Sequence, residues 1–221
     1  MSFETDGYEI IKNFLTQEQV ASYRQSLDHY LDTQKCFRTN GAKIVPGFAD
    51  RSPELGELNE LHRSEKMLST IQKFFGENKF IFLDHSDLHQ NQMTDWHRDA
   101  NDYKRGGGRP ERIWEEDCFI IKVCLLLQDH TNNDKGLWFQ SGTHKSNISG
   151  KQVCAHTEPT DLVVFDQRIF HRGQMGTPKY HEIYGINRYL ITYGYGLDNE
   201  HSAIHIKGAN NRQTEQRTYM G

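Results

Sequence analysis

The order of hydrophobic patterns along the chain predicts an α+β fold whose core is a double-sheet barrel or jelly roll. Two segments in the N-terminal third repeat apolar residues at helical spacing. After residue 76 the pattern changes to about eight short β-type segments separated by Gly, Asn, Asp and Pro. Neither an internal repeat nor an inter-domain linker interrupts this order, so we expect one domain over residues 1–221.

Length and composition support a soluble single domain. The chain has 221 residues, 35% of them hydrophobic, and a mean hydropathy of -0.80. Its longest apolar runs are far too short for a bilayer and no signal peptide opens it, so we expect a cytoplasmic protein without a membrane partner. A net charge of -4 without a Lys/Arg block argues against a nucleic-acid partner. The four cysteines form no C-x-x-C pair, which argues against a zinc ribbon or a disulfide scaffold.

The N-terminal part, about 1–76, is expected to supply flanking helices. A short strand over 7–11 comes first. A helix is predicted over 15–31, because Thr16 can cap it, Gln19 follows three residues later, and apolar residues recur at helical spacing. A second helix is predicted over about 57–75, ended by a glycine.

The β core is expected over about 77–197, with strands at 79–90, 92–98, 118–128, 136–140, 152–156, 161–165, 168–172 and 186–195. Residues 100–117 form an irregular, glycine-rich insertion, which is either a lid over a site or a loose surface loop. Residues 198–221 are polar and predict a C-terminal surface extension. In that extension His201 and His205 could share a helix face as metal ligands, although surface histidines are the simpler interpretation.

The run Trp96-His97-Arg98-Asp99 carries the most informative chemical pattern. On a β-strand, residues i and i+2 point to the same side, so His97 and Asp99 can converge on one metal ion. His171, from the later segment 165–173, could supply the third ligand. Two imidazoles and one carboxylate form the ligand face typical of non-heme ferrous iron, with the opposite face open for chemistry.

The His-x-acid spacing occurs three times in this chain of 12 histidines, so the surroundings of each pair must decide. His97-x-Asp99 is favoured by the tryptophan beside it and by the glycine-rich insertion that follows. His85-x-Asp87 could also face inward on its strand and is the serious competitor. The pair at 156–158 runs into a proline and a turn, a poor setting for a fixed ligand.

Several segments occur in the order found in one known enzyme family. Residues 161–173 read DLVVFDQRIFHRG, residues 136–145 read GLWFQSGTHK after LQDH at 127–130, and the opening shows DGY at 6–8 before IKNFLT at 11–16. These segments resemble the distal-histidine segment, the strand, turn and "GSH"-like loop, and the N-terminal opening of the phytanoyl-CoA dioxygenase family of iron(II)/2-oxoglutarate oxygenases. The resemblance covers nearly the whole chain.

The resemblance implies a double-stranded β-helix core in which His97, Asp99 and His171 bind Fe(II). It also implies a basic residue on the following strand that pairs with the far carboxylate of 2-oxoglutarate. Arg188 occupies that place, and a guanidinium suits bidentate binding of a carboxylate.

This sequence departs from the family pattern at two places. Gly173 stands where relatives often carry a serine that helps to bind the co-substrate, so another donor must compensate; Gln92 and Lys122 are the candidates. Residues 174–181 lengthen the usual connection between the distal histidine and the arginine. Trp138 falls where some relatives carry a threonine near the co-substrate, so it is either a pocket residue or an ordinary core aromatic.

The resemblance implies a dioxygenase that uses Fe(II), 2-oxoglutarate and O2 and hydroxylates, or otherwise oxidises, a C–H bond of a small-molecule metabolite, releasing succinate and CO2. Asp99 occupies the coordination place that related halogenases leave for chloride, so halogenation is not expected, whereas ring closure and desaturation stay open. Two alternatives remain: a cupin-like metal protein that does not use 2-oxoglutarate, and a non-catalytic module that binds a small molecule.

Overall fold

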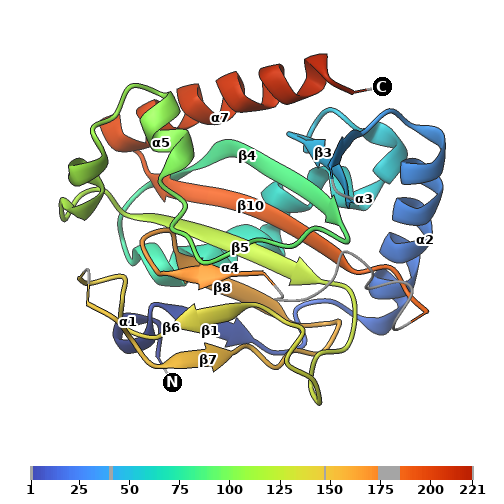
Figure 1. The fold of residues 1–221 in the computed structure, drawn as a ribbon, viewed down its shortest axis with the longest axis horizontal. Helices are drawn as coiled ribbons and strands as arrows, with labels where there is room; N and C mark the ends of the chain where they lie inside the picture. The colour runs from blue at the N-terminus through green and yellow to red at the C-terminus, as the bar shows by residue number, and fades with distance from the viewer. Residues whose placement is uncertain (1, 40–41, 147, 174–184, 221) are drawn as a thin grey trace.

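Two antiparallel sheets form the core of the computed structural model, which describes residues 2–39, 42–146, 148–173 and 185–220 (Figure 1). The seven-stranded sheet has the order β1-β8-β5-β10-β4-β3-β2, and the three-stranded sheet has the order β7-β6-β9. The strands are β1 (Tyr8–Ile11), β2 (Phe37–Thr39), β3 (Ala42–Pro46), β4 (Phe80–Gln90), β5 (Ile120–Leu126), β6 (Trp138–Gln140), β7 (Gln152–Cys154), β8 (Leu162–Asp166), β9 (His171–Arg172) and β10 (Tyr189–Leu197). The predicted α+β jelly-roll class is confirmed.

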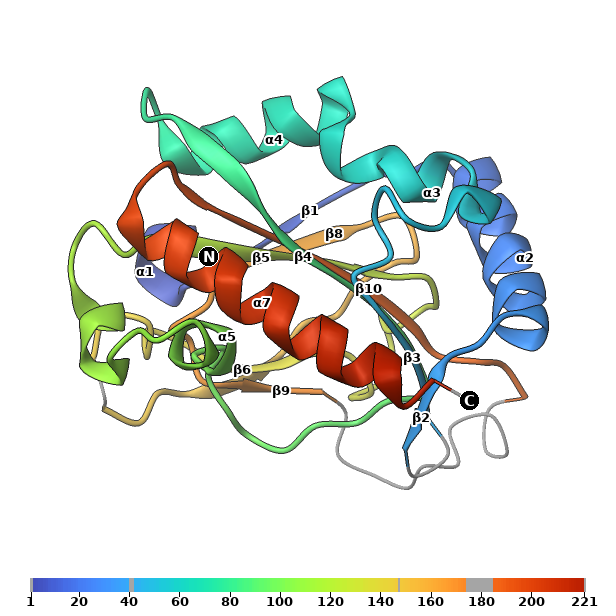
Figure 2. The ribbon, with the colours of Figure 1, turned by 90° about the horizontal axis from the view of Figure 1, so that it is seen from above.

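The helices are α1 (Phe3–Asp6), α2 (Gln17–Thr33), α3 (Glu57–Glu60), α4 (Glu65–Phe75), α5 (Asn101–Arg105) and α7 (Glu200–Thr218), with 3-10 turns η1 (Pro53–Leu55), η2 (Leu61–Arg63) and η3 (Pro110–Trp114). Helices α2 to α4 cover the outer face of the large sheet, and the small sheet lies on its other face together with α5 and α7 (Figure 2). Helix α2 begins as expected. The Gln19 amide donates to Thr16 Oγ1, and the Gln19 side chain accepts from the Thr16 amide.

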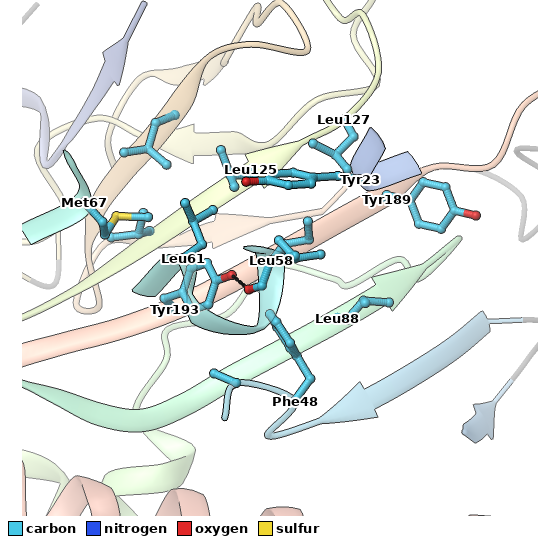
Figure 3. Close-up of a cluster of buried hydrophobic side chains, with 14 of the residues drawn as sticks. Tyr23, Phe48, Leu58, Leu61, Met67, Leu88, Leu125, Leu127, Tyr189 and Tyr193 are labelled. Carbon is cyan, nitrogen blue, oxygen red and sulfur yellow. Dashed lines mark hydrogen bonds between the residues drawn. The ribbon is translucent and has the colours of Figure 1, made fainter. Parts of the chain in front are cut away.

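The main hydrophobic core lies between the large sheet and helices α2 to α4 (Figure 3). Leu27 and Met67 are fully buried there. Tyr193 is buried in the same cluster, and its hydroxyl donates to the backbone carbonyl of Leu58 at 3.0 Å. That bond satisfies a polar atom that would otherwise be costly to bury. It also joins the sheet to the helical layer.

The alternation of side chains along the strands places a cavity on the inner face of the large sheet. In β10, Tyr189, Ile191 and Tyr193 point toward the helices, so Leu190 and Thr192 point inward and line the cavity. In the same way, Lys122 and Cys124 of β5 and His85, Asp87 and His89 of β4 reach the cavity. Most functional side chains therefore come from the face of the sheet that helices α2 to α4 do not cover.

Three local expectations were wrong. The helix predicted over 57–75 is interrupted, because Ser64 is extended and caps α4 by accepting the Met67 amide at 3.2 Å. No regular strand forms over 92–98, where the pairing is one isolated bridge between His97 and His171. The N-terminal part also supplies the β2–β3 hairpin, which adds to the edge of the large sheet.

The C-terminal segment is not a surface extension. It forms the 19-residue helix α7, which packs against β4 and α5 (Figure 2). Its buried side includes Gly208, where a Cβ would lie 1.6 Å from the carbonyl oxygen of Asp102. On the facing helix, a Cβ at Gly106 would lie 1.9 Å from the carbonyl oxygen of Ile204. The two helices can approach this closely because both contact positions are glycines.

The insertion at 100–117 is ordered rather than a loose surface loop. It contains α5 and η3, and Tyr103 is fully buried with its hydroxyl 2.8 Å from Nδ1 of His201. Its first residues, Asn101 and Asp102, line the cavity, so this segment covers the site. The lengthened connection at 174–181 lies outside the described residues. Among the described helices, none is long and apolar enough to cross a membrane.

Candidate active site

His97 and His171 lie side by side because their backbones pair. The His97 amide donates to the His171 carbonyl at 2.8 Å, and the reciprocal bond measures 2.9 Å. Side chains directly opposite each other on paired antiparallel segments point to the same face. Their ring centroids are accordingly 4.3 Å apart.

Asp99 joins the two histidines from the same segment as His97. Its amide donates to the Gln167 carbonyl at 3.1 Å, which fixes the backbone beyond His97. One carboxylate oxygen, Oδ1, lies 3.5 Å from Nε2 of His97, and the other, Oδ2, lies 3.9 Å from Nε2 of His171. The ligand atoms of all three residues lie within 4.8 Å of one another. The predicted ligand set is therefore brought together in space.

Both imidazoles are oriented by the same local hydrogen bond. Nδ1 of His97 donates to the Asp95 carbonyl at 2.7 Å, and Nδ1 of His171 donates to the Ile169 carbonyl at 3.0 Å. Each acceptor is two residues before its histidine. A donor role for Nδ1 leaves the lone pair on Nε2, the atom that faces Asp99. Metal-binding histidines commonly have this arrangement, in which the nitrogen that does not bind the metal donates to a neighbouring acceptor.

The electrostatics of Asp99 and His171 suit a metal centre. Burial alone would raise the pKa of Asp99, but the neighbouring Lys122 and His171 hold that pKa well below its usual value. Burial lowers the pKa of His171 to about 4. Burial also acts to lower the pKa of His97, but the hydrogen bond to Asp99, the charge of Asp99 and the Asp95 carbonyl together outweigh burial, so the pKa is raised. At neutral pH the carboxylate is ionised and His171 is neutral, the states in which both can bind a cation.

The triad opens into a cavity of about 280 Å³ that also contains Arg188. Arg188 immediately precedes β10 and is only 1% exposed. Its Nη1 donates to the backbone carbonyl of Gln92 at 3.1 Å, and both residues line the cavity. The walls between include Leu137, Phe165 and Leu190. The cavity thus has a buried cation at a position separate from the triad, with apolar walls.

Lys122 lies between the triad and His85, which belongs to a second group of polar residues in the cavity. It is 2% exposed on the central strand β5. Its Nζ is 3.9 Å from Oδ2 of Asp99 and 2.9 Å and 3.0 Å from Nδ1 and Nε2 of His85. All six residues predicted for the site, namely His97, Asp99, His171, Arg188, Gln92 and Lys122, line one cavity.

Thr94 is a cavity residue that was not among the predicted site residues. Its Oγ1 accepts a hydrogen bond from the Gly173 amide at 2.8 Å, and both residues line the cavity. A hydroxyl is therefore present beside Gly173, although it comes from a different segment than the serine of relatives. A lone threonine in an irregular segment carries no sequence signal that could have revealed this.

The competing pair, His85 and Asp87, lies in the same cavity but in different surroundings. His85 Nδ1 donates to Oδ2 of Asp102 at 2.8 Å, and Arg212 of α7 lies 2.8 Å from Oδ2 of Asp87. Ligand atoms of His85, Asp102 and the fully buried His205 lie within 4.8 Å of one another. The guanidinium of Arg212 already pairs with both carboxylates, Asp87 and Asp102, and competes with a metal cation for them.

The remaining candidates are His201, His205, His156 and Trp138. The side chains of His201 and His205 lie on the buried side of α7, so their interpretation as surface histidines was wrong. His156 is near Asp134 and Cys154, outside the cavity. Trp138 does not line the cavity, and its ring instead packs against the guanidinium of Arg172.

Comparisons with known proteins identify the family and the fold. A family model described as phytanoyl-CoA dioxygenase (PhyH) matches residues 3–175. HygX from Streptomyces hygroscopicus, solved with nickel, 2-oxoglutarate and hygromycin B, is 16% identical over 89% of this chain and 85% of that chain, with a TM-score of 0.66. Among curated proteins no sequence matches the chain.

Two further solved structures share the fold. The non-heme alpha ketoglutarate dependent epimerase SnoN from nogalamycin biosynthesis is 15% identical over 87% of this chain and 78% of that chain, with a TM-score of 0.66. EctD from S. alaskensis, solved with 2-oxoglutarate and 5-hydroxyectoine, is 15% identical over 88% of this chain and 73% of that chain, with a TM-score of 0.63. Together with the family match over most of its length, the fold shows that this chain belongs to the phytanoyl-CoA dioxygenase family.

Proposed function

We propose that the protein is a non-heme Fe(II)- and 2-oxoglutarate-dependent dioxygenase that hydroxylates a C–H bond of a small-molecule metabolite and releases succinate and CO2. The observation that carries the proposal is the convergence of His97, Asp99 and His171 in a cavity that also contains the buried Arg188. Membership of the phytanoyl-CoA dioxygenase family supports it. A cytoplasmic location and the absence of a nucleic-acid partner stay predictions.

The three side chains suit iron(II) by their donor atoms, by the orientation of the two rings and by the ionised state of Asp99. Two imidazole nitrogens and one carboxylate are the set that non-heme iron oxygenases use, and they leave neighbouring coordination positions for other ligands. Each Nδ1 is engaged with a backbone carbonyl, which makes Nε2 the atom of each ring that would bind the metal. Asp99 stays ionised because the neighbouring ammonium of Lys122 lowers its pKa. Residues 97 and 99 supply two ligands from one segment and His171 supplies the third.

Arg188 would bind the far carboxylate of 2-oxoglutarate. A guanidinium can donate two parallel hydrogen bonds to a carboxylate, and burial strengthens such bonds. The Gln92 carbonyl fixes the guanidinium through Nη1. Lys122 and Gln92 are the proposed second anchors for the co-substrate, and Thr94 adds a hydroxyl beside Gly173. The apolar walls would contact the methylene groups of the co-substrate.

When bound, iron supplies activation of dioxygen, while 2-oxoglutarate gives up two electrons and leaves as succinate and CO2. The chain's own residues orient and shield this chemistry. The His97–His171 backbone bridge fixes two ligands relative to each other, and the segment 100–117 covers the cavity from one side. Such cover excludes bulk water from a reactive centre. The structural neighbours were solved with small molecules, hygromycin B and 5-hydroxyectoine, which supports a small-molecule substrate here.

The test is an anaerobic titration with Fe(II) and 2-oxoglutarate, followed by visible absorption. A weak metal-to-ligand charge-transfer band should form in the wild type. His97→Ala should abolish it and His85→Ala should keep it; the reverse pattern would move the metal to the competing group. Under air, succinate should be released when the right metabolite is supplied. A metal spectrum that 2-oxoglutarate leaves unchanged would favour the cupin-like alternative, and co-substrate binding without succinate under all conditions would favour the binding module.

A further inference from the structure

Helix α7 contributes to the cavity although it lies beyond the residues that match the family model. That match ends at residue 175, whereas α7 spans Glu200–Thr218. Two of its side chains, Arg212 and Gln216, line the cavity that contains the iron-binding residues. Nη1 of Arg212 donates to Oε1 of Gln216 at 2.8 Å, so the two form one surface. One wall of the cavity is therefore built by a helix outside the family-matched segment.

Arg212 is engaged by two buried carboxylates from other elements. Its Nε donates to Oδ1 of Asp102 on α5 at 2.8 Å, and its Nη2 lies 2.8 Å from Oδ2 of Asp87 on β4. These contacts draw α7, α5 and β4 together at one point. The guanidinium is 16% exposed, and it lines the cavity.

His85 completes this group, which we call the α7 cluster (His85, Asp87, Asp102 and Arg212). The imidazole lies between Asp102, at 2.8 Å from Nδ1, and Asp87, at 3.4 Å from Nε2. It is 12% exposed, whereas each of the two carboxylates is 6% exposed. The groups of the cluster that a bound molecule can reach are therefore chiefly the imidazole and the guanidinium.

The α7 cluster is one side chain away from the iron ligands. Nζ of Lys122 is 2.9 Å from Nδ1 of His85 and 3.9 Å from Oδ2 of Asp99. A molecule that contacts His85 would thus place its neighbouring atoms beside the metal site. None of the proposed co-substrate anchors, Arg188, Gln92 and Lys122, belongs to the cluster, so binding of 2-oxoglutarate does not require the Arg212 guanidinium.

The charges around the cavity cancel. Among the described residues that line it, the carboxylates are Asp87, Asp99 and Asp102, and the cationic side chains are Lys122, Arg188 and Arg212. The two positive charges of iron(II) and the two negative charges of 2-oxoglutarate would cancel as well. A substrate with a net charge would lose its hydration without meeting an uncompensated opposite charge, which is unfavourable. Polar groups without net charge can still exchange hydrogen bonds with the imidazole and the guanidinium.

We propose that the α7 cluster is the substrate-recognition subsite and that it selects a compact polar molecule without net charge, either a neutral molecule with hydroxyl or amide groups or a zwitterion. This inference rests on the proposed function. It excludes acyl-CoA thioesters and phosphate esters as substrates, because both are anionic and the former also far exceed a cavity of about 280 Å³.

The experiment is a succinate-release screen with Fe(II) and 2-oxoglutarate under air. The probes are polyols and glycosides, amino acids and betaines, mono- and dicarboxylates, phosphate esters, and acyl-CoA thioesters. A compact neutral or zwitterionic compound should raise succinate release above the substrate-free rate. Arg212→Gln should then raise the KM of that compound about 10-fold or more, while the KM of the co-substrate changes less than about twofold.

The matched control is Arg105→Gln. Arg105 pairs at the surface with Glu215 of the same helix α7 at 2.6 Å, outside the cavity, so it should leave both KM values unchanged. If Arg212→Gln does not fold, the double variant Asp102→Asn/Arg212→Gln takes its place in the test. The double variant removes one negative and one positive charge, so the net charge of the cluster stays unchanged. The charge-transfer band confirms that each variant is folded at the iron site.

Stimulation confined to anionic compounds would overturn the inference. So would an unchanged substrate KM in the Arg212 variants, or no stimulation by any compact probe while the wild-type band is intact. Absence of the band in the wild type would instead refute the proposed function.

Discussion

Two histidine–carboxylate groups share the cavity, and their surroundings separate their roles. In the triad, Asp99 faces two imidazole Nε2 atoms whose rings are fixed by their own backbone carbonyls. In the α7 cluster, Asp87 and Asp102 face a guanidinium that already balances them. The same residue types therefore form a candidate metal site where the protein cation, Lys122, stands 3.9 Å from the carboxylate, and a polar wall where Arg212 pairs with both carboxylates at 2.8 Å.

The largest expected effect tests whether Arg212 balances the charges of Asp87 and Asp102 in the α7 cluster. Arg212→Gln should lower the free energy of unfolding by about 3–5 kcal/mol, because two buried carboxylates lose their partner. Urea denaturation measures the change. Arg105→Gln, which breaks an exposed pair, should cost less than about 1 kcal/mol. Equal effects of the two substitutions would mean that the α7 cluster is no more coupled to the fold than a surface ion pair.

The next effect separates the two groups by metal binding. His171→Ala should weaken Fe(II) binding by more than about 100-fold, since it removes a direct ligand and losses of 10–100-fold follow from outer-shell changes alone. His205→Ala removes the buried histidine of the other group and should leave Fe(II) affinity unchanged. Anaerobic equilibrium dialysis measures both. Loss of iron in His205→Ala would place the metal on the other side of Lys122.

The comparison is sharpened by Arg188, the cavity cation outside both groups. Arg188→Ala should raise the KM of the co-substrate by about 10–50-fold, because charge-assisted hydrogen bonds to its carboxylate are lost. Arg188→Lys keeps the charge without the paired donors and should recover part of the affinity. Steady-state kinetics measure the change, with circular dichroism as the check on folding. If only the fold is lost and folded protein keeps its KM, Arg188 is a structural residue.

The smallest effect is a pH dependence of the α7 cluster. Burial alone would raise the pKa of Asp87, but Arg212 lowers it to about 2. A lowered pKa stabilises the folded state above the ordinary value near 4, and this stabilisation is lost as the pH falls toward 2. Between about pH 5 and pH 3 the wild type should lose about 1 kcal/mol more stability than Asp87→Asn. Parallel losses in urea titrations at the two pH values would contradict the pairing.

Much of the fold could be predicted because its signals are local. The capping box at Thr16 and the short apolar run of β8 depend on near neighbours in the chain. The candidate ligands His97 and Asp99 were found by their spacing, and His171 by the resemblance of its segment to a known family.

The features that could not be predicted depend on contacts between distant segments. Helix α7 has no apolar stripe, because the side that it buries carries His201, His205 and Gln213 together with Gly208 and Ala209. A hydrophobic pattern cannot reveal such a helix, since its partners are the carbonyls of α5 and the polar groups of β4. For the same reason, neither Arg212 nor Thr94 could be placed in the cavity from the sequence.

The reciprocal bonds between His97 and His171 join segments 74 residues apart through one pair of amides. Those two amide protons are therefore natural reporters of site assembly. They should exchange with deuterated solvent at a common rate, because both hydrogen bonds break when the two segments separate. Metal loading should slow both together, so isotope exchange at two backbone positions can time the joining of the ligand-bearing segments without any assay of turnover.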